Sequence, residues 1–239
     1  MIKITFMGAG STVFAKNVIG DIMLCDELHN CEIALYDINN ARLSESEMLL
    51  STLNKNCNKN RAVIKSYLGV ENRKEALRGA DFVVNAVNVG GYKPSTVIDF
   101  EIPKKYGLRQ TIADTLGIGG IFRALRTIPV MRGFAEDIEE VCPNAWFLNY
   151  TNPMAMLSGF MERYTNVKTV GLCHSVQVCS SKLLERLGIP SDGIVDKIAG
   201  INHMAWLLEI RDKDGNDLYP EIKRLAAEKN ANEKHTDMV

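Results

Sequence analysis

The first forty residues constrain the fold most strongly, because an apolar run, a glycine turn, a helical pattern and a second apolar run follow one another there. The first run, residues 2–7, leads into Gly-Ala-Gly-Ser at residues 8–11, and a helical periodicity then extends to about residue 24. The second run, residues 32–36, ends at Asp37. This succession predicts a βαβ unit, in which a helix joins two parallel strands.

The same alternation continues along most of the chain. We expect further strands at residues 62–67, 81–87, 145–149 and 168–172, with helical patterns between them. The longest helical pattern, residues 121–141, contains Pro129, which should kink the helix or end it. The alternation predicts an α/β fold, a Rossmann-like, doubly wound parallel sheet covered by helices on both faces.

The pattern changes near residue 194. Two strand candidates at 194–199 and 205–210 precede a turn at 212–215 and a charged helix from about Pro220. We therefore expect a nucleotide-binding domain over residues 1–193 and the beginning of a second, α+β substrate domain over 194–239. Because the polar C-terminus has no obvious closing element, we also expect the chain to be a fragment of a longer protein.

Composition excludes several classes of partner. The 239 residues are 46% hydrophobic and 24% charged, with a formal net charge of −1, so no strongly basic face for nucleic acid is indicated. No stretch approaches the roughly 18 apolar residues that a membrane span needs, and the N-terminal apolar run is too short for a signal peptide. The six cysteines form no C-x-x-C pair, which favours free thiols in a reducing, cytoplasmic location.

The glycine turn and Asp37 together indicate a dinucleotide site. Gly8 permits a tight turn, and Gly10 lets the backbone approach a pyrophosphate at the helix N-terminus. Val13 replaces the third glycine of the usual pattern, and a glycine turn beside an unrelated surface aspartate is the alternative. A carboxylate at Asp37 would accept hydrogen bonds from ribose hydroxyls and repel a 2′-phosphate, which favours NAD over NADP. The residues that we expect at the cofactor are Gly8, Gly10, Ser11, Asp37 and Asn88.

Two further motifs follow expected strands. Asn152, in Thr-Asn-Pro, can present a donor and an acceptor to a cofactor or sugar hydroxyl, although a helix cap explains it equally well. Cys173 and His203 offer a thiolate and an imidazole that can hold a divalent cation with positions open for substrate. Two such residues 30 positions apart are no recognisable metal motif, so a buried cysteine and a hydrogen-bonded histidine are the alternative.

The chain resembles glycoside hydrolase family 4 through a series of segments in the order and spacing of that family. The segments are residues 8–11 (GAGS), 113–120 (ADTLGIGG), 123–129 (RALRTIP), 150–153 (YTNP), 171–175 (GLCHS) and 200–203 (GINH). Cys-His-Ser and Asn-His-Met look most like the α-galactosidase branch. Members that act on 6-phosphorylated sugars carry an acidic or amide residue after the cysteine, where this chain has His174.

The resemblance implies hydrolysis of α-galactosides with NAD and Mn²⁺ through oxidation at C3, deprotonation at C2 and elimination at C1 of the sugar. It implies that Cys173 and His203 bind the metal and that Asn152 contacts the sugar. It further implies that His174 is the acid toward the leaving oxygen and that Asp114 lines the same cavity. Members of the family are homodimers or homotetramers, and their C2 base is a tyrosine or aspartate that we expect beyond residue 239.

Other functions stay open on the sequence alone. Within the family, an α-glucosidase or an α-galacturonidase is the nearest alternative. Lactate and malate dehydrogenases share the expected topology and a similar Asn-Pro turn, so a 2-hydroxy-acid dehydrogenase is a second one. Such an enzyme needs an Asp-His relay, a carboxylate-binding arginine and no metal, whereas this chain offers Cys173 and His203. A nucleotide-binding scaffold without catalysis is the third alternative, should the chain be complete.

Overall fold

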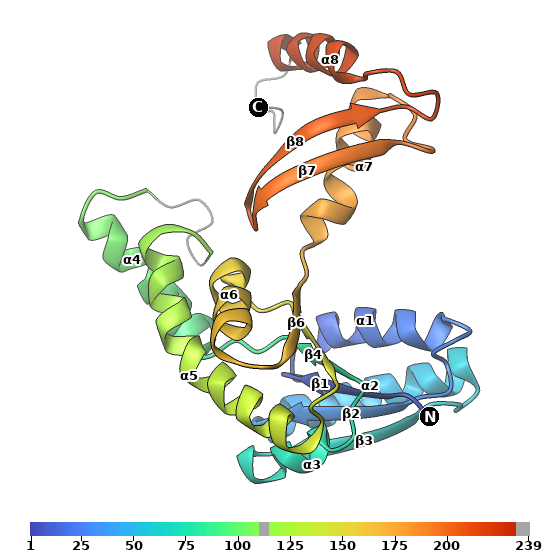
Figure 1. Ribbon diagram of the computed structural model, residues 1–239, viewed down its shortest axis with the longest axis vertical. Coiled ribbons are helices and arrows are strands. Elements are labelled where there is room, and N and C mark those ends of the chain that lie inside the picture. The colour runs from blue at the N-terminus through green and yellow to red at the C-terminus, as the bar shows by residue number, and fades with distance from the viewer. Residues whose placement is uncertain (110–114, 233–239) are drawn as a thin grey trace. The chain divides into compact units, whose positions relative to one another are not determined.

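The computed structural model describes residues 1–109 and 115–232 of the chain, except for the side chains of His174 and Gln177. It divides into two compact units, residues 1–172 and 173–239 (Figure 1). The expected domain boundary after residue 193 falls inside the second unit. The division of the whole protein into domains at that residue stays a prediction.

The first unit is built on one parallel sheet with the strand order β3-β2-β1-β4-β5-β6. The strands are β1 (Lys3–Met7), β2 (Glu32–Asp37), β3 (Val63–Leu68), β4 (Phe82–Asn85), β5 (Trp146–Asn149) and β6 (Lys168–Gly171). Strands β2 and β3 are added on one side of β1, and β4, β5 and β6 are added on the other side. At the point where the order of addition reverses, between β1 and β4, the carboxyl ends of the strands open a crevice for ligands. The predicted doubly wound sheet is confirmed.

Helices cover both faces of this sheet (Figure 1). They are α1 (Thr12–Leu24), α2 (Asn40–Asn58), α3 (Arg73–Leu77), α4 (Val97–Lys105), α5 (Gly117–Val141) and α6 (Met154–Tyr164), with short helical segments η1 (Val70–Asn72) and η2 (Gly91–Thr96). Strand side chains alternate between the faces. Phe6 therefore lies in the cluster with Ile19 of α1, whereas Met7 lies in the cluster with Met131 of α5. Both strand residues are completely buried.

Two details refine the sequence-based expectations. Of the two effects expected of Pro129, a kink or an end, the second does not occur, because α5 continues through it to Val141. Proline removes the hydrogen bond to the carbonyl of Leu125, and the helix is held by the packing of buried residues on both sides of Pro129, among them Ala124 and Phe134. The stretch from residue 90 to 109, where no regular element was expected, contains η2 and α4.

The second unit contains α7 (His174–Leu187), the strands β7 (Val195–Ile201) and β8 (Met204–Arg211), and α8 (Tyr219–Asn232). The strands form an antiparallel hairpin. Among the described residues of this unit, the buried apolar cluster is formed by Leu184, Ile210 and Ile222, which come from α7, β8 and α8. The expected hairpin strands, the turn after them and the C-terminal helix are confirmed. None of the helices in the described part of the chain has the length and hydrophobicity of a membrane span.

Candidate functional site

The turn after β1 takes a conformation that only glycine adopts without strain. Gly8 has φ +87°, and a Cβ there would stand 2.9 Å from the backbone oxygen of Ala86 at the end of β4. The N–H groups of Gly8 and Ala9 both donate to the carbonyl of Tyr36 at 2.9 Å. Ser11 precedes α1 without capping it through its side chain. The turn therefore leaves the first N–H groups of α1 available to an anion.

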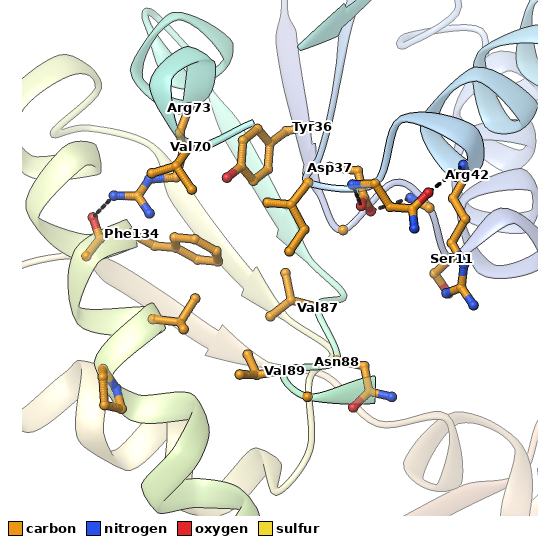
Figure 2. Close-up of a pocket in the computed structure, with 18 residues that line it drawn as sticks. Ser11, Tyr36, Asp37, Arg42, Val70, Arg73, Val87, Asn88, Val89 and Phe134 are labelled. Atoms are coloured by element: carbon orange, nitrogen blue, oxygen red, sulfur yellow. Dashed lines mark hydrogen bonds between the residues drawn. The ribbon is translucent and has the colours of Figure 1, made fainter. Parts of the chain in front are cut away.

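Asp37 is tied to this turn from the end of β2. Its Oδ2 accepts the N–H of Gly10 at 2.7 Å, and its Oδ1 accepts the N–H of Asn39 at 2.8 Å (Figure 2). A Cβ on Gly10 would lie 2.7 Å from that Oδ2, so only glycine fits beside the carboxylate. Each carboxylate oxygen has a further lone-pair direction. Asp37 is thus held in one orientation and can still accept hydrogen bonds from a ligand.

A pocket of about 530 Å³ opens at the carboxyl ends of β1, β2 and β4. It is lined by Gly8, Gly10, Ser11, Tyr36, Asp37, Ile38, Asn39, Arg42, Val70, Arg73, Val87, Asn88, Val89, Gly90, Pro129, Val130, Gly133 and Phe134. In Figure 2 the polar groups around Asp37 lie on one side, and valines and Phe134 lie on the other. The structure brings together all five residues expected at the cofactor, and the volume suits a cofactor or drug-sized ligand.

The loop after β4 forms one wall of the pocket and is held by α5. The Arg126 guanidinium donates to the carbonyl of Val89 at 3.1 Å and makes two hydrogen bonds, of 3.1 and 2.6 Å, to the buried carboxylate of Asp99. Arg123 donates to Oδ1 of Asn88 at 3.3 Å. Both arginines belong to the Arg-Ala-Leu-Arg-Thr-Ile-Pro segment. These contacts fix the backbone that carries Asn88.

Several pocket residues were missed by sequence reasoning. Arg42 lies beside the glycine turn, since a Cβ on Gly10 would stand 2.8 Å from the Cβ of Arg42, and Figure 2 shows its side chain extending alongside Ser11. Its position in the first turn of α2, just after Asp37, is a signal that sequence reasoning can use. This guanidinium adds positive charge where a phosphate is expected.

The far end of the pocket is made by residues with no such sequence signal. Arg73 forms a 2.5 Å ion pair with Asp137, donates to the carbonyl of Gly133 at 3.1 Å and lies 5.1 Å from the Phe134 ring centre. Burial raises the pKa of the Tyr36 phenol, which also lines this end of the pocket. These side chains meet only because η1, α3 and α5 pack together.

Asn152 stands just before α6, at the carboxyl end of β5. Its Oδ1 accepts the N–H of Met154, two residues further on, at 3.3 Å, whereas Pro153 occupies the N-cap position of α6, which has no side-chain capping hydrogen bond. This contact engages the oxygen, and the amide nitrogen remains chemically suited to a sugar hydroxyl. A role in substrate binding stays a prediction.

Cys173 and His203 both lie in the second unit. Cys173 is the half-buried residue preceding α7, and His203 lies in the turn that joins β7 to β8. His203 has φ +62°, a left-handed conformation that tight turns between antiparallel strands commonly use and for which histidine is enriched among non-glycine residues. The described residues contain no cluster of three or more His, Cys, Asp or Glu suited to a metal.

Two further expected residues, Asp114 and His174, lie wholly or partly outside the described residues. Asp114 lies outside the described residues. His174 is the first residue of α7, directly after Cys173, and its side chain is outside the described part as well. Their roles as a cavity residue and as the acid stay predictions.

Comparison with known proteins identifies the family. The sequence model of family 4 glycosyl hydrolases matches residues 3–189, and that of the family 4 C-terminal domain matches residues 198–239. An α-galactosidase of Bacillus subtilis (strain 168) is 65% identical over 239 residues, which are 100% of this chain and 54% of that protein. The chain thus spans about half the length of this curated relative.

Solved structures agree with this assignment. A putative glucosidase, LplD, of Bacillus subtilis has 28% identity and a TM-score of 0.85 over 99% of this chain and 54% of its own. A 6-phospho-α-glucosidase from gut microorganisms, in complex with NAD and glucose-6-phosphate, has 26% identity and a TM-score of 0.80 over 93% of this chain and 49% of its own. On the family match and the 65% identity, the chain belongs to family 4 of the glycosyl hydrolases.

Proposed function

We propose that this chain is part of an α-galactosidase that cleaves its substrate with the help of bound NAD and a divalent metal ion. The single observation that carries this proposal is the 65% identity with the Bacillus subtilis α-galactosidase along the entire chain. His174, after the cysteine, also resembles the α-galactosidase branch. Family membership argues against the dehydrogenase alternative, although the fold is shared.

The residues of the first unit fit NAD. The glycine turn leaves no room for a Cβ at Gly8 or Gly10, the N-terminus of α1 is available to the pyrophosphate, and Asp37 can accept the ribose hydroxyls. Arg42 would add a cation beside the phosphates. A related 6-phospho-α-glucosidase was solved with NAD. NAD bound there would supply a hydride acceptor for the sugar.

Cys173 and His203 would hold the metal ion. A thiolate and an imidazole both bind divalent transition metals, and two protein ligands leave positions for two sugar oxygens. When bound, the metal supplies positive charge that stabilises negative charge developing on those oxygens. Mn²⁺ is the expected ion, but thiolate ligation also suits Zn²⁺ or Co²⁺.

The remaining residues would orient the sugar and move protons. Oxidation at C3 would make the C2 proton acidic, so that a base could remove it as the C1 substituent leaves, and water would then add at C1. Asn152 would orient a sugar hydroxyl, and His174 would protonate the departing oxygen. Asp114 would line the same cavity. A cytoplasmic homodimer or homotetramer without nucleic-acid or membrane partners is the expected assembly, and light scattering of the purified protein tests its size.

The function is tested by assaying the full-length protein on a panel of p-nitrophenyl glycosides with and without NAD, Mn²⁺ and reductant. We expect α-galactoside cleavage that needs both cofactors. Deuterium at C3 or C2 should slow the reaction, and a C2 label should exchange into solvent. Cleavage of an unactivated galactoside by NAD-free enzyme at an undiminished rate, without C2 exchange, would contradict the redox route. An α-glucoside or α-galacturonide preference would reassign the substrate within the family.

The replacement Asp37→Ala is expected to weaken NAD binding by about 10- to 150-fold. The variant loses the charge-assisted hydrogen bonds to the ribose, worth about 1.5–3 kcal/mol, and the carboxylate that fixes Gly10. Titration with NAD measures the change. Asp81→Ala, which removes an aspartate from the opposite end of the sheet, is the control and should retain wild-type affinity. Unchanged affinity in Asp37→Ala would remove Asp37 from the cofactor site.

A further inference from the structure

A pair of buried amides joins the ends of β4 and β5. Asn85 and Asn149 are the last residues of these strands, lie opposite each other in the parallel register and are completely buried. The Asn85 side-chain nitrogen donates to Oδ1 of Asn149 at 2.9 Å. Burying two amides inside an α/β core is costly unless they are hydrogen-bonded. Polar side chains at this place therefore call for an explanation beyond packing.

The amide pair is linked to Thr151, which is almost completely buried. The Asn85 nitrogen also donates to the Thr151 hydroxyl at 3.1 Å, and that hydroxyl donates to the carbonyl of Val87 at 3.1 Å. The Thr151 backbone is held by Asn149, whose Oδ1 accepts the Thr151 N–H at 3.1 Å and whose Nδ2 donates to the Thr151 carbonyl at 3.2 Å. The Thr151 hydroxyl thus bridges the loops that follow β4 and β5.

The two bridged loops carry different parts of the candidate site. Val87 lines the pocket and is followed by Asn88, which lines it too (Figure 2). Thr151 is followed by Asn152, the expected sugar contact. Because one hydroxyl accepts from the core amide and donates to the neighbouring loop, its removal leaves the Asn85 nitrogen and the Val87 carbonyl each without that hydrogen bond. The strand ends stay joined by the Asn85–Asn149 hydrogen bond and by the Tyr150 N–H, which donates to the Asn85 carbonyl at 2.9 Å, but the direct side-chain link to the Val87 loop is lost.

We propose that Thr151 is a positioning residue that sets the distance between the cofactor loop and the substrate loop during hydride transfer. The inference rests on the proposed function, since it assigns NAD to one loop and the sugar to the other. Transfer between bound groups depends steeply on their separation, and a displacement of about 1 Å costs on the order of 10²-fold in rate. The bridge acts on the geometry between the two ligands and leaves the NAD contacts at Gly8 and Asp37 unchanged.

Three variants of the full-length protein test this role. Thr151→Val keeps the shape of the side chain and removes the hydroxyl, and Thr151→Ser keeps the hydroxyl. Thr5→Val is the matched control, because Thr5 is buried in β1 of the same sheet and its hydroxyl donates to the carbonyl of Ala76 at 2.7 Å, away from both loops. The measurements are thermal stability, NAD affinity, kcat on an α-galactoside and the isotope effect with deuterium at C3.

For Thr151→Val we expect kcat to fall by about 10- to 100-fold, NAD affinity to stay within about threefold, and the C3 isotope effect to increase because hydride transfer becomes slower. Thr151→Ser should stay near wild type, and Thr5→Val should lose stability without losing kcat. The inference is overturned if Thr151→Val loses no more kcat than Thr5→Val, or if Thr151→Ser is as impaired as Thr151→Val. Wild-type protein that cleaves galactosides without NAD would overturn the proposed function and this inference together.

Discussion

Replacement of Cys173 by serine is expected to lower kcat by on the order of 10²- to 10³-fold, because the variant loses the thiolate that would hold the metal. The fold should not suffer. Cys173 occupies the N-cap position of α7, where its side chain makes no capping hydrogen bond. Serine is among the most favourable residues at an N-cap position. A loss of activity at unchanged or higher thermal stability would therefore result from the missing thiolate and not from unfolding. The measurements are kcat, melting temperature and metal content after dialysis.

The matched control is Cys179→Ser. Cys179 lies on the same helix, its thiol is free and it is exposed, so its replacement should leave activity and metal content unchanged. The same pair tests alkylation, which should inactivate the wild type and the Cys179 variant equally. Full metal content in the Cys173 variant would remove Cys173 from the metal site.

Replacement of Gly8 by alanine is expected to weaken NAD binding by at least about 10-fold, which corresponds to only about 1.4 kcal/mol. The added Cβ would stand 2.9–3.0 Å from backbone atoms of Ala86 and Val87, which cannot rotate away as a side chain would. Alanine also disfavours φ +87°, at a cost on the order of 1–3 kcal/mol to the free energy of unfolding. NAD titration and chemical denaturation measure the two effects.

Gly20→Ala supplies the comparison for this variant. Gly20 lies within α1, and a Cβ there would meet nothing within 4 Å. Alanine should stabilise that helix by about 0.5–1 kcal/mol and leave NAD affinity unchanged. If both alanine variants bind NAD like the wild type, the glycine turn does not hold the pyrophosphate.

The sheet was predictable because its strands are short apolar runs separated by helical periodicity and by turn glycines. A parallel strand buried on both faces, such as β2 with its Ile33-Ala34-Leu35 core, leaves a clear signal in the sequence. The helix α4 was missed because Pro94 and Pro103 lie in or just before it and prolines ordinarily end helices. In this case local composition and the packed structure disagree.

The candidate site likewise contains residues that the sequence predicts and residues that only the packed structure brings together. Gly8 and Asp37 were predictable because backbone conformation and the end of a strand impose their residue types. Arg73 and Phe134 were not, since η1, α3 and α5 bring them to the pocket from distant parts of the sequence. The bridge at Thr151 was also missed, because it is defined by partners on another strand, which the Thr-Asn-Pro motif does not reveal.

The first unit buries two extensive apolar clusters, one on each face of the same sheet. Because the same strands carry both clusters, a substitution that destabilises either face should lower the free energy of unfolding of the whole sheet and, with it, nucleotide binding. Cys173 and His203 lie in the other unit. Bound nucleotide in a preparation would therefore report that the first unit is folded, and the absorbance of that nucleotide would not measure the fraction of working enzyme.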